Sequence, residues 1–171
     1  MKVLFVCAAN TCRSPMIEQM FKQYAFARDR KDIEVDSAGL LPNTCGVLLN
    51  PVCASVLEKH GVPYNAERAA KLCTQKDIAS SDLVYAMDDD QAEFIKEQFG
   101  GRKKVRSLSE LCGGPVPDPY GYDEEVYEKT YRIFNEALGK IFEEATKKKG
   151  LFSFLNRKKV IYCCKITRKS K

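Results

Sequence analysis

Near the start of the chain, five residues separate a cysteine from an arginine, Cys7 and Arg13, and a serine follows at Ser14. The backbone N–H groups of a short loop can converge on one point, and a guanidinium can bind two oxygens of an anion at once. A cysteine in such positive surroundings favours its thiolate form, which is a nucleophile. This spacing therefore predicts a loop that binds a phosphoryl group beside an attacking sulfur.

Two side chains next to this pair suit an anion-binding loop. Ser14 can donate a hydrogen bond to the Cys7 sulfur, and Asn10 can brace the loop through its amide. A buried, inert cysteine followed by ordinary turn residues is the alternative, but the elements expected on either side favour a binding site. The expected phosphate contacts come from Ala8, Ala9, Asn10, Thr11, Cys12, Arg13 and Ser14.

The loop lies between a predicted strand and a predicted helix. Residues 3–6 form an uninterrupted apolar run that is typical of a strand buried on both faces. From Pro15, apolar residues recur every three or four positions, which indicates an amphipathic helix with proline at its first position. The positive end of that helix dipole would favour a bound anion.

The alternation of strand and helix continues along the chain. Further strands are expected at 33–35, 83–87 and 105–108, and helices at 52–59 and 88–99. Strands that alternate with helices predict a single three-layer α/β domain, in which helices cover both faces of a parallel sheet.

A second candidate for chemistry lies in a late loop rich in proline and glycine, residues 113–121. There the proline after Asp118 would stiffen a loop that carries a carboxylate, although an aspartate before proline also favours a simple turn. The helix that follows has an acidic start and a basic end, and it is expected to stop at Gly150. We therefore expect a domain at residues 1–150 and an extension at residues 151–171.

Charge is unevenly distributed along the 171 residues. The formal net charge is +5, but ten of the 28 Lys and Arg and none of the 23 Asp and Glu lie in residues 147–171. Residues 1–146 therefore carry a formal charge of −5. A nucleic-acid partner would require a basic domain, so none is expected.

Cysteine usage favours a reducing compartment. The apolar start of the chain ends at Asn10, which is too short for the core of about 7 to 15 residues that an export signal needs, so a cytoplasmic location is expected. The eight cysteines contain no C-x-x-C pair and the chain has one histidine, so a zinc site is poorly supported.

Val6–Pro15 resembles the active-site loop of the low-molecular-weight protein tyrosine phosphatases, whose pattern is V-C-x-x-N-x-C-R-S-P. The resemblance covers residues 1–146 and includes three further segments in the same order: Asp36–Gly39, Leu83–Asp88 and Asp118–Tyr120. It implies a four-stranded parallel sheet with helices on both faces, no metal and no cofactor. It also implies hydrolysis of phosphotyrosine in phosphorylated protein substrates, and we expect a monomer.

The resemblance implies a role for each site residue. Cys7 would attack phosphorus and form a phosphocysteine, while Arg13 and the loop amides stabilise the charge of the transferring group. Asp118 would protonate the leaving oxygen and then activate water for the second step. Cys12 would form a reversible disulfide with Cys7 under oxidation, and a small packing residue is the alternative at that position.

The chain departs from the family pattern at the loop and at the walls of the expected substrate slot. Ala9 replaces a usual glycine, so the loop must avoid a positive φ there or accept strain. One wall offers Leu48 and Leu49 instead of an aromatic residue, and the other offers the rings of Tyr120 and Tyr122, which could also be half-buried turn residues.

Thr11 bears on the substrate. Tyrosine phosphatases of the family commonly have an aliphatic residue there, whereas the related protein arginine phosphatases have threonine. The favoured hypothesis is a phosphotyrosine phosphatase and the alternative is an arginine phosphatase. Less favoured are an arsenate reductase, because Cys73 and Cys112 form no close pair, and a non-catalytic phosphoprotein-binding module, because Cys7 and Asp118 are both present.

Residues 151–171 combine an apolar stretch with basic residues and the adjacent pair Cys163 and Cys164. One hypothesis is that this tail contacts an anionic membrane surface or accepts lipid on those cysteines. The alternative is a loosely ordered basic extension.

Overall fold

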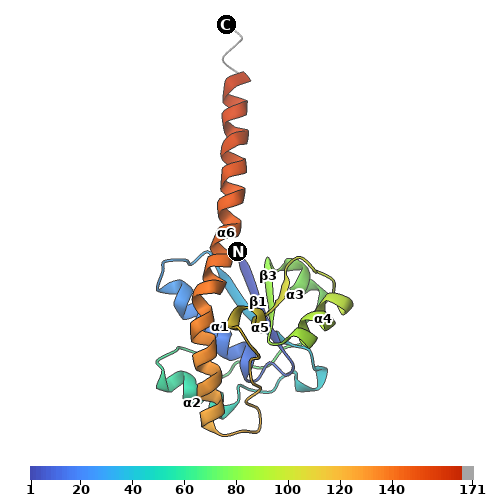
Figure 1. Ribbon diagram of the computed structural model, residues 1–171, viewed down its shortest axis with the longest axis vertical. Helices are drawn as coiled ribbons and strands as arrows, with labels where there is room; N and C mark the ends of the chain where they lie inside the picture. The colour runs from blue at the N-terminus through green and yellow to red at the C-terminus, as the bar shows by residue number, and fades with distance from the viewer. Residues whose placement is uncertain (167–171) are drawn as a thin grey trace.

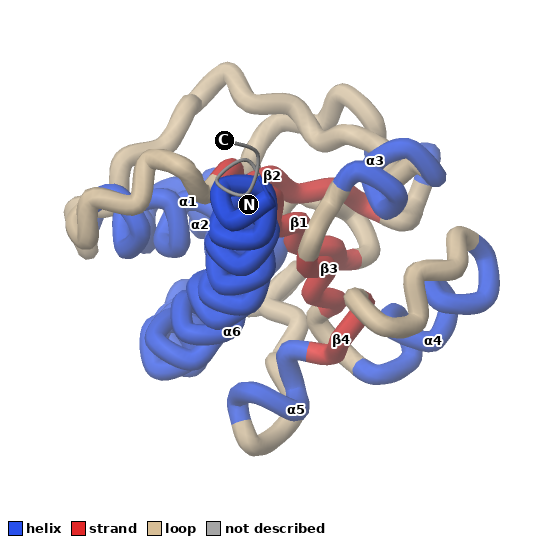
Figure 2. Tube along the Cα trace, turned by 90° about the horizontal axis from the view of Figure 1, so that it is seen from above, coloured by secondary structure: helices blue, strands red, loops and turns tan. Residues whose placement is uncertain are grey.

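The computed structural model describes the backbone of residues 1–166 and the side chains of residues 1–147. Its centre is one sheet of four parallel strands in the order β2-β1-β3-β4 (Figures 1 and 2). The predicted parallel sheet is confirmed. The strands are β1 (Lys2–Cys7), β2 (Glu34–Gly39), β3 (Leu83–Ala86) and β4 (Val105–Ser107).

Helices cover both faces of the sheet, as predicted (Figure 2). On one face lie α1 (Arg13–Phe26), α2 (Pro51–Lys59), α5 (Leu108–Cys112) and α6 (Glu124–Ile166). On the other face lie α3 (Gln75–Ser80) and α4 (Asp89–Gln98), and a short 3-10 helix, η1, spans Pro42–Thr44.

The central strand β1 is buried on both faces because its side chains alternate between two apolar layers. Val3 and Phe5 belong to the layer under α1, α2 and α6, whereas Leu4 and Val6 belong to the layer under α3 and α4. All four side chains have no exposed surface. This packing fixes the carboxyl end of β1, from which the candidate loop begins.

The carboxyl ends of β1 and β3 form the point at which the chain changes direction across the sheet. The chain leaves β1 toward α1 on one face, and it leaves β3 toward α4 on the other. In open α/β sheets the loops at such a point separate and leave a crevice for a ligand. The fold therefore places the loop after β1 at the edge where a binding site is expected.

Several predicted boundaries are wrong. Helix α1 begins at Arg13 rather than at Pro15, and α3, α5 and η1 were not expected. The predicted stop at Gly150 is also wrong, because α6 continues to Ile166 and extends well beyond the sheet (Figure 1). A glycine inside a helix lowers the stability of the helix by only about 1 kcal/mol relative to alanine, so a glycine alone does not end one. A helix ends at a glycine where the backbone there takes a left-handed conformation.

Candidate active site

The loop between β1 and α1 turns its carbonyl groups outward. The Ala8 carbonyl accepts from the N–H groups of Leu40 and Leu41 at 2.8 and 2.9 Å, and the Thr11 carbonyl accepts from Asn50 at 3.0 Å. The carbonyls of residues 7 and 10 are held in the same way, by the N–H of residue 40 and the guanidinium of residue 68. The surrounding segments thus hold four carbonyls of the loop, those of residues 7, 8, 10 and 11.

The outward carbonyls determine where the loop N–H groups point. None of the described peptide bonds is cis, and in a trans peptide the C=O of one residue and the N–H of the next point in opposite directions. The N–H groups of Ala8, Ala9, Thr11 and Cys12 therefore face away from those partners, toward the inside of the loop. Cys12 then occupies the N-cap of α1 without a side-chain capping bond, and this helix start adds partial positive charge.

Gly39 allows the loop to lie against the end of β2. A Cβ atom at this position would lie 3.0 Å from the Ala8 oxygen and the Ala9 carbonyl carbon, and 3.1 Å from the Asn10 Cβ. Gly39 pairs with Cys7 in the sheet register, so this contact lies directly beside the sulfur-bearing residue. The close approach explains why glycine is required in the segment Asp36–Gly39.

The backbone of the loop takes a left-handed conformation at one position. Asn10 has φ of 58°, whereas Ala9 is outside the positive-φ region, as expected for alanine. Asn10 is fully buried, and its N–H donates to the Cys7 sulfur at 3.2 Å. Its amide Nδ2 donates to Ser14 Oγ at 2.9 Å, so the predicted bracing role is met in the geometry.

Ser14 and Asn10 together surround the Cys7 sulfur with hydrogen-bond partners. Cys7 Sγ lies 3.0 Å from Ser14 Oγ, and the sulfur-bearing side chain is nearly buried. A sulfur that accepts hydrogen bonds is stabilised as the thiolate.

Arg13 is a buried guanidinium with two carboxylate partners from distant loops. Its Nη2 bonds to Asp118 Oδ2, and its Nη1 lies 3.6 Å from Asp88 Oδ2. The other Asp118 oxygen accepts from the Tyr120 N–H at 3.2 Å. The structure therefore brings together Cys7, Arg13 and Asp118 at one edge of the sheet.

A cleft of about 490 Å³ opens in front of this group. Its polar lining comes from the loop, from Asp118 and from Thr44 and Asn50. The rim is aliphatic on one side and also includes Tyr120, which is 67% exposed. Leu48 lines the cleft as expected, but Leu49 is buried, and Tyr122 is not among the lining residues. The full lining is Cys7, Ala8, Ala9, Thr11, Cys12, Arg13, Leu41, Thr44, Val47, Leu48, Asn50, Pro51, Asp118 and Tyr120.

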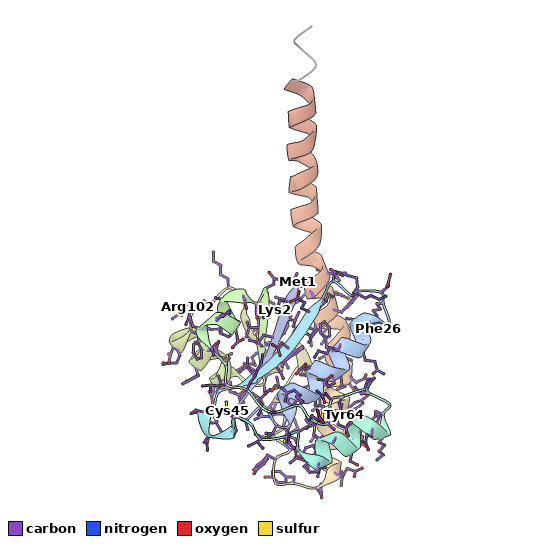
Figure 3. All side chains as sticks on the ribbon, turned by 180° about the vertical axis from the view of Figure 1, so that it is seen from behind. Met1, Lys2, Phe26, Cys45, Tyr64 and Arg102 are labelled. Carbon is purple, nitrogen blue, oxygen red and sulfur yellow. The ribbon has the colours of Figure 1, made fainter. Side chains whose placement is uncertain are left out.

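The cleft lies at the end of the domain away from the N-terminus. Figure 3 shows Cys45, which follows the lining residue Thr44, near the end opposite Met1 and Lys2. The part of α6 that leaves the domain begins at the end where Met1 lies (Figure 1). The site and the projecting helix are therefore at opposite ends of the molecule.

Cys12 is buried at the inner wall of the cleft. Its Sγ lies 3.4 Å from the Tyr127 hydroxyl of α6 and 3.6 Å from the Thr11 hydroxyl. Burial raises the pKa of the Cys12 thiol, although the bonds from Tyr127 and Thr11 oppose that effect. Burial also raises the pKa of Cys53, whose thiol donates to the Cys12 carbonyl at 3.5 Å.

Four residues of the site were not found from the sequence. Glu18, Ser37 and Arg68 surround Asn10 behind the loop, and Asp88 pairs with Arg13. Ser37 lies in a segment that carries the family resemblance, and that is a signal that could have found it. Asp88 ends the segment Leu83–Asp88, which also carries the resemblance, and it caps α4 by accepting from the Gln91 N–H at 2.8 Å.

Within residues 1–147, no group of three or more His, Cys, Asp or Glu side chains is arranged to hold a metal ion. Among the described residues that line the cleft, Arg13 is the one cation and Asp118 the one carboxylate. This arrangement suits an anion next to a sulfur nucleophile.

A family model described as low molecular weight phosphotyrosine protein phosphatase matches residues 2–151. The chain belongs to this family. The resemblance inferred from the motifs is therefore confirmed, and the chain is a phosphatase, a hydrolase that acts on phosphorylated proteins.

Individual members of the phosphatase family are similar over nearly their whole length. The protein-arginine-phosphatase of Bacillus subtilis (strain 168) is 34% identical over 151 residues, which cover 86% of this chain and 98% of that protein. The low molecular weight phosphotyrosine protein phosphatase of Sus scrofa is 31% identical over 151 residues, with 81% and 94% covered. The crystal structure of the low molecular weight protein tyrosine phosphatase from T. tengcongensis has a TM-score of 0.77 at 36% identity, with 84% and 99% covered.

Proposed function

We propose that this phosphatase hydrolyses phosphotyrosine in proteins through a phosphocysteine formed on Cys7. The observation that carries the proposal is the convergence of the Cys7 sulfur, the inward N–H groups of the loop and the Arg13 guanidinium on one cleft. Donors fixed around a point where charge develops stabilise a transferring phosphoryl group.

In the first step, the Cys7 thiolate attacks phosphorus and an S–P bond forms while the P–O bond to the tyrosine breaks. The departing oxygen takes a proton from Asp118, so tyrosine leaves as the neutral phenol. Arg13 and the loop amides hold the phosphoryl oxygens in this step. Asp118 must release Arg13 for it, since the two are paired in the structure.

In the second step, Asp118 accepts a proton from a water molecule whose oxygen attacks phosphorus. The S–P bond breaks, inorganic phosphate forms and the Cys7 thiolate is restored. A relative supports the covalent step, because a solved mutant of the YwlE arginine phosphatase carries a phosphorylated active-site serine. That structure is 33% identical, has a TM-score of 0.78, and the match covers 88% of this chain and 99% of that chain.

Phosphate release from a phosphotyrosine peptide tests the proposal, with Cys7→Ser as the blank. We expect the substitution to lower kcat by about 10⁴-fold or more, since it removes the nucleophile. Activity that survives Cys7→Ser would overturn the mechanism.

A second candidate substrate is phosphoarginine, and one observation favours it. Thr11 lines the same cleft as Cys7, where its hydroxyl can orient a polar guanidino leaving group or the attacking water. The side of the rim formed by Leu41, Val47 and Leu48 also offers no aromatic ring to a phenol, and Tyr120 is the one aromatic among the described residues that line the cleft.

Matched phosphotyrosine and phosphoarginine peptides decide between the two substrates, with Thr11→Ile as the probe. If phosphotyrosine is the substrate, Thr11→Ile leaves its kcat/KM within about threefold of the unsubstituted protein, because a hydroxyl contributes little to an aromatic slot. A preference of the unsubstituted protein for phosphoarginine, lost in Thr11→Ile, would assign the second substrate instead.

We also propose that Cys12 protects Cys7 from irreversible oxidation. Peroxide oxidises the Cys7 thiolate to a sulfenic acid, and attack by the Cys12 sulfur forms a disulfide with loss of water. A thiol reductant then restores both residues. Recovery from peroxide should be nearly complete for the unsubstituted protein and small for Cys12→Ser, and equal recovery would contradict this role.

For the whole chain we propose a cytoplasmic monomer that binds no nucleic acid, with a tail that contacts an anionic membrane surface. The support is the acidic charge of residues 1–146 and the ten basic residues of 147–171. Among the described residues, no helix combines the length and the apolar character that crossing a membrane requires. The adjacent Cys163 and Cys164 lie outside the residues whose side chains are described.

A further inference from the structure

A second polar network lies behind the loop, on the side away from the cleft. Its centre is Arg68, which belongs to the irregular segment between α2 and α3 and has a side chain that is 13% exposed. Arg68 Nη2 donates to Asn10 Oδ1 at 2.8 Å and to Ser37 Oγ at 2.6 Å, and its Nη1 donates to the Asn10 carbonyl at 3.2 Å. None of these three residues lines the cleft.

Arg68 helps to determine which way the Asn10 amide faces. A guanidinium and a backbone N–H can only donate hydrogen bonds. The end of the Asn10 amide that receives Arg68 Nη2, and the Lys71 N–H at 3.1 Å, must therefore be its oxygen. The NH₂ end then faces the loop.

The direction of that amide decides the direction of the remaining bonds. Asn10 Nδ2 donates to Ser37 Oγ at 2.8 Å, and Ser37 uses its own proton for Glu18 Oε2 at 2.6 Å. Asn10 Nδ2 also donates to Ser14 Oγ at 2.9 Å. The proton of Ser14 is thereby directed at the Cys7 sulfur, 3.0 Å away.

The Cys7 sulfur therefore accepts two hydrogen bonds, from Ser14 Oγ and from the Asn10 N–H, and both depend on how Asn10 is held. The bond from Arg68 to the Asn10 carbonyl also stabilises the left-handed backbone, which costs free energy in a residue other than glycine. One side chain thus acts on both bonds to the sulfur.

We propose that Arg68 is a positioning residue of this phosphatase, which fixes the direction of the hydrogen bonds that end on Cys7 and so favours the thiolate. The inference rests on the proposed role of Cys7 as the nucleophile. The Lys71 N–H still reaches Asn10 when Arg68 is removed, so a partial loss is expected rather than a complete one. On the cleft side, the charged groups around the network are Arg13, Asp88 and Asp118. Behind the loop they are Glu18, Lys22, Asp36, Arg68 and Lys71.

The test compares Arg68→Met with the unsubstituted protein through the rate at which iodoacetamide modifies the Cys7 peptide. At about pH 6, where ordinary cysteines are thiols, Arg68→Met should react about tenfold more slowly, the loss expected for one charge-assisted hydrogen bond. At about pH 10, where cysteine thiols ionise, the two rates should agree. The kcat should fall about tenfold, and Arg68→Lys should recover part of both losses, since an ammonium is a donor at the same place.

A surface arginine provides the control. Arg30 pairs with Asp32 at 2.7 Å away from the site, so Arg30→Met should leave both rates unchanged. Arg68→Met leaves the buried Glu18 with Lys22 as its remaining cationic partner. The double variant Glu18→Gln with Arg68→Met removes both buried charges and so guards against misfolding.

The double variant should show the same slow modification at about pH 6, where a cysteine without stabilisation stays protonated. Unchanged modification at low pH in Arg68→Met, or normal reactivity restored in the double variant, would overturn the proposal. Modification of Cys7 needs no substrate, so the proposal about Arg68 and the proposed phosphatase reaction can fail separately.

Discussion

Asp118 is held at both carboxylate oxygens, by Arg13 on one side and by the Tyr120 N–H on the other. Its side chain is half exposed, so it can swing toward a leaving group once the phosphoryl group occupies the donors of Arg13. The residue is thus placed to deliver a proton at the mouth of the cleft.

Asp118→Asn should slow the release of poor leaving groups much more than the release of good ones. We expect kcat/KM, which reports the first step alone, to fall about 10²- to 10⁴-fold with phenyl phosphate, because the phenol must be protonated as it leaves. The kcat also contains the second step, in which Asp118 activates water, so kcat/KM is the quantity compared. The loss should be much smaller with p-nitrophenyl phosphate, whose leaving group needs no proton. Steady-state kinetics with both esters measure this, and equal losses would argue against the role as general acid.

Gly39→Ala should disturb the loop from behind without touching a charged group. The added Cβ would come within 3.0 Å of the Ala8 oxygen, where backbone must shift. We expect a loss of about 1–3 kcal/mol in the free energy of unfolding and a lower kcat. Gly114→Ala is the matched control, since its Cβ meets nothing within 4 Å and its φ is not positive. Denaturant unfolding and phosphatase assays of both variants measure the effects, and Gly114→Ala should change neither the free energy of unfolding nor kcat.

At the scale of elements, the sequence predicted the strands and helices whose apolar residues form a clear local pattern. The apolar run of β1 and the spacing of α1 identified the unit that carries the loop, and the roles proposed for Cys7 and Arg13 depend on residues close together in the chain. Helices α3 and α5 have six and five residues, too few to show a helical period.

Longer-range features had no local signal. Arg68 reaches Asn10 across 58 positions and Asp118 reaches Arg13 across 105, so only the folded chain brings them together. His60, the one histidine, likewise has partners that are distant in the sequence. It lies at the end of α2 with its ring stacked on Tyr131 at 3.9 Å, and it is bonded to Glu128 at 2.8 Å.

Glu128 links α6 to α2 through His60 and through Lys59, which lies 2.9 Å away. The bond with His60, followed by that with Lys59, lowers the pKa of the Glu128 carboxyl. The ionised form therefore stabilises the fold above the ordinary glutamate pKa of about 4.3, and that contribution disappears as the pH falls through the lower value in the folded state.

Glu128→Gln should accordingly lower the melting temperature at about pH 7 by about 2–4 °C. The difference from the unsubstituted protein should shrink as the pH falls below about 4, because both proteins are then uncharged at this position. Calorimetry across this pH range measures the gap. A gap that stays constant with pH would contradict the ionic origin.

At the scale of the whole molecule, the catalytic cleft and the basic tail differ in charge and lie at opposite ends. The cleft lies in the acidic part of the chain, and the ten basic residues of 147–171 follow the opposite end of the domain. A membrane bound by the tail would therefore leave the cleft open to protein substrates.

Sedimentation with vesicles that contain anionic lipid tests the tail. The full chain should sediment with the vesicles at low ionic strength and be released by salt, since each basic residue near the surface contributes about 1 kcal/mol. A chain that ends at Gly150 should stay in the supernatant, with vesicles of neutral lipid as the control. Equal binding by both chains would remove the tail as the contact.

Helix α6 has 43 residues, about 65 Å at 1.5 Å per residue, and its C-terminal part projects beyond the sheet as a rod (Figure 1). A rod that projects from a domain raises the friction of the molecule in water far more than it raises the mass. If the 19.3 kDa chain is a monomer, as proposed, it should therefore elute early from a size-exclusion column, in the range of a compact dimer. Sedimentation equilibrium, which does not depend on shape, should return the mass of one chain.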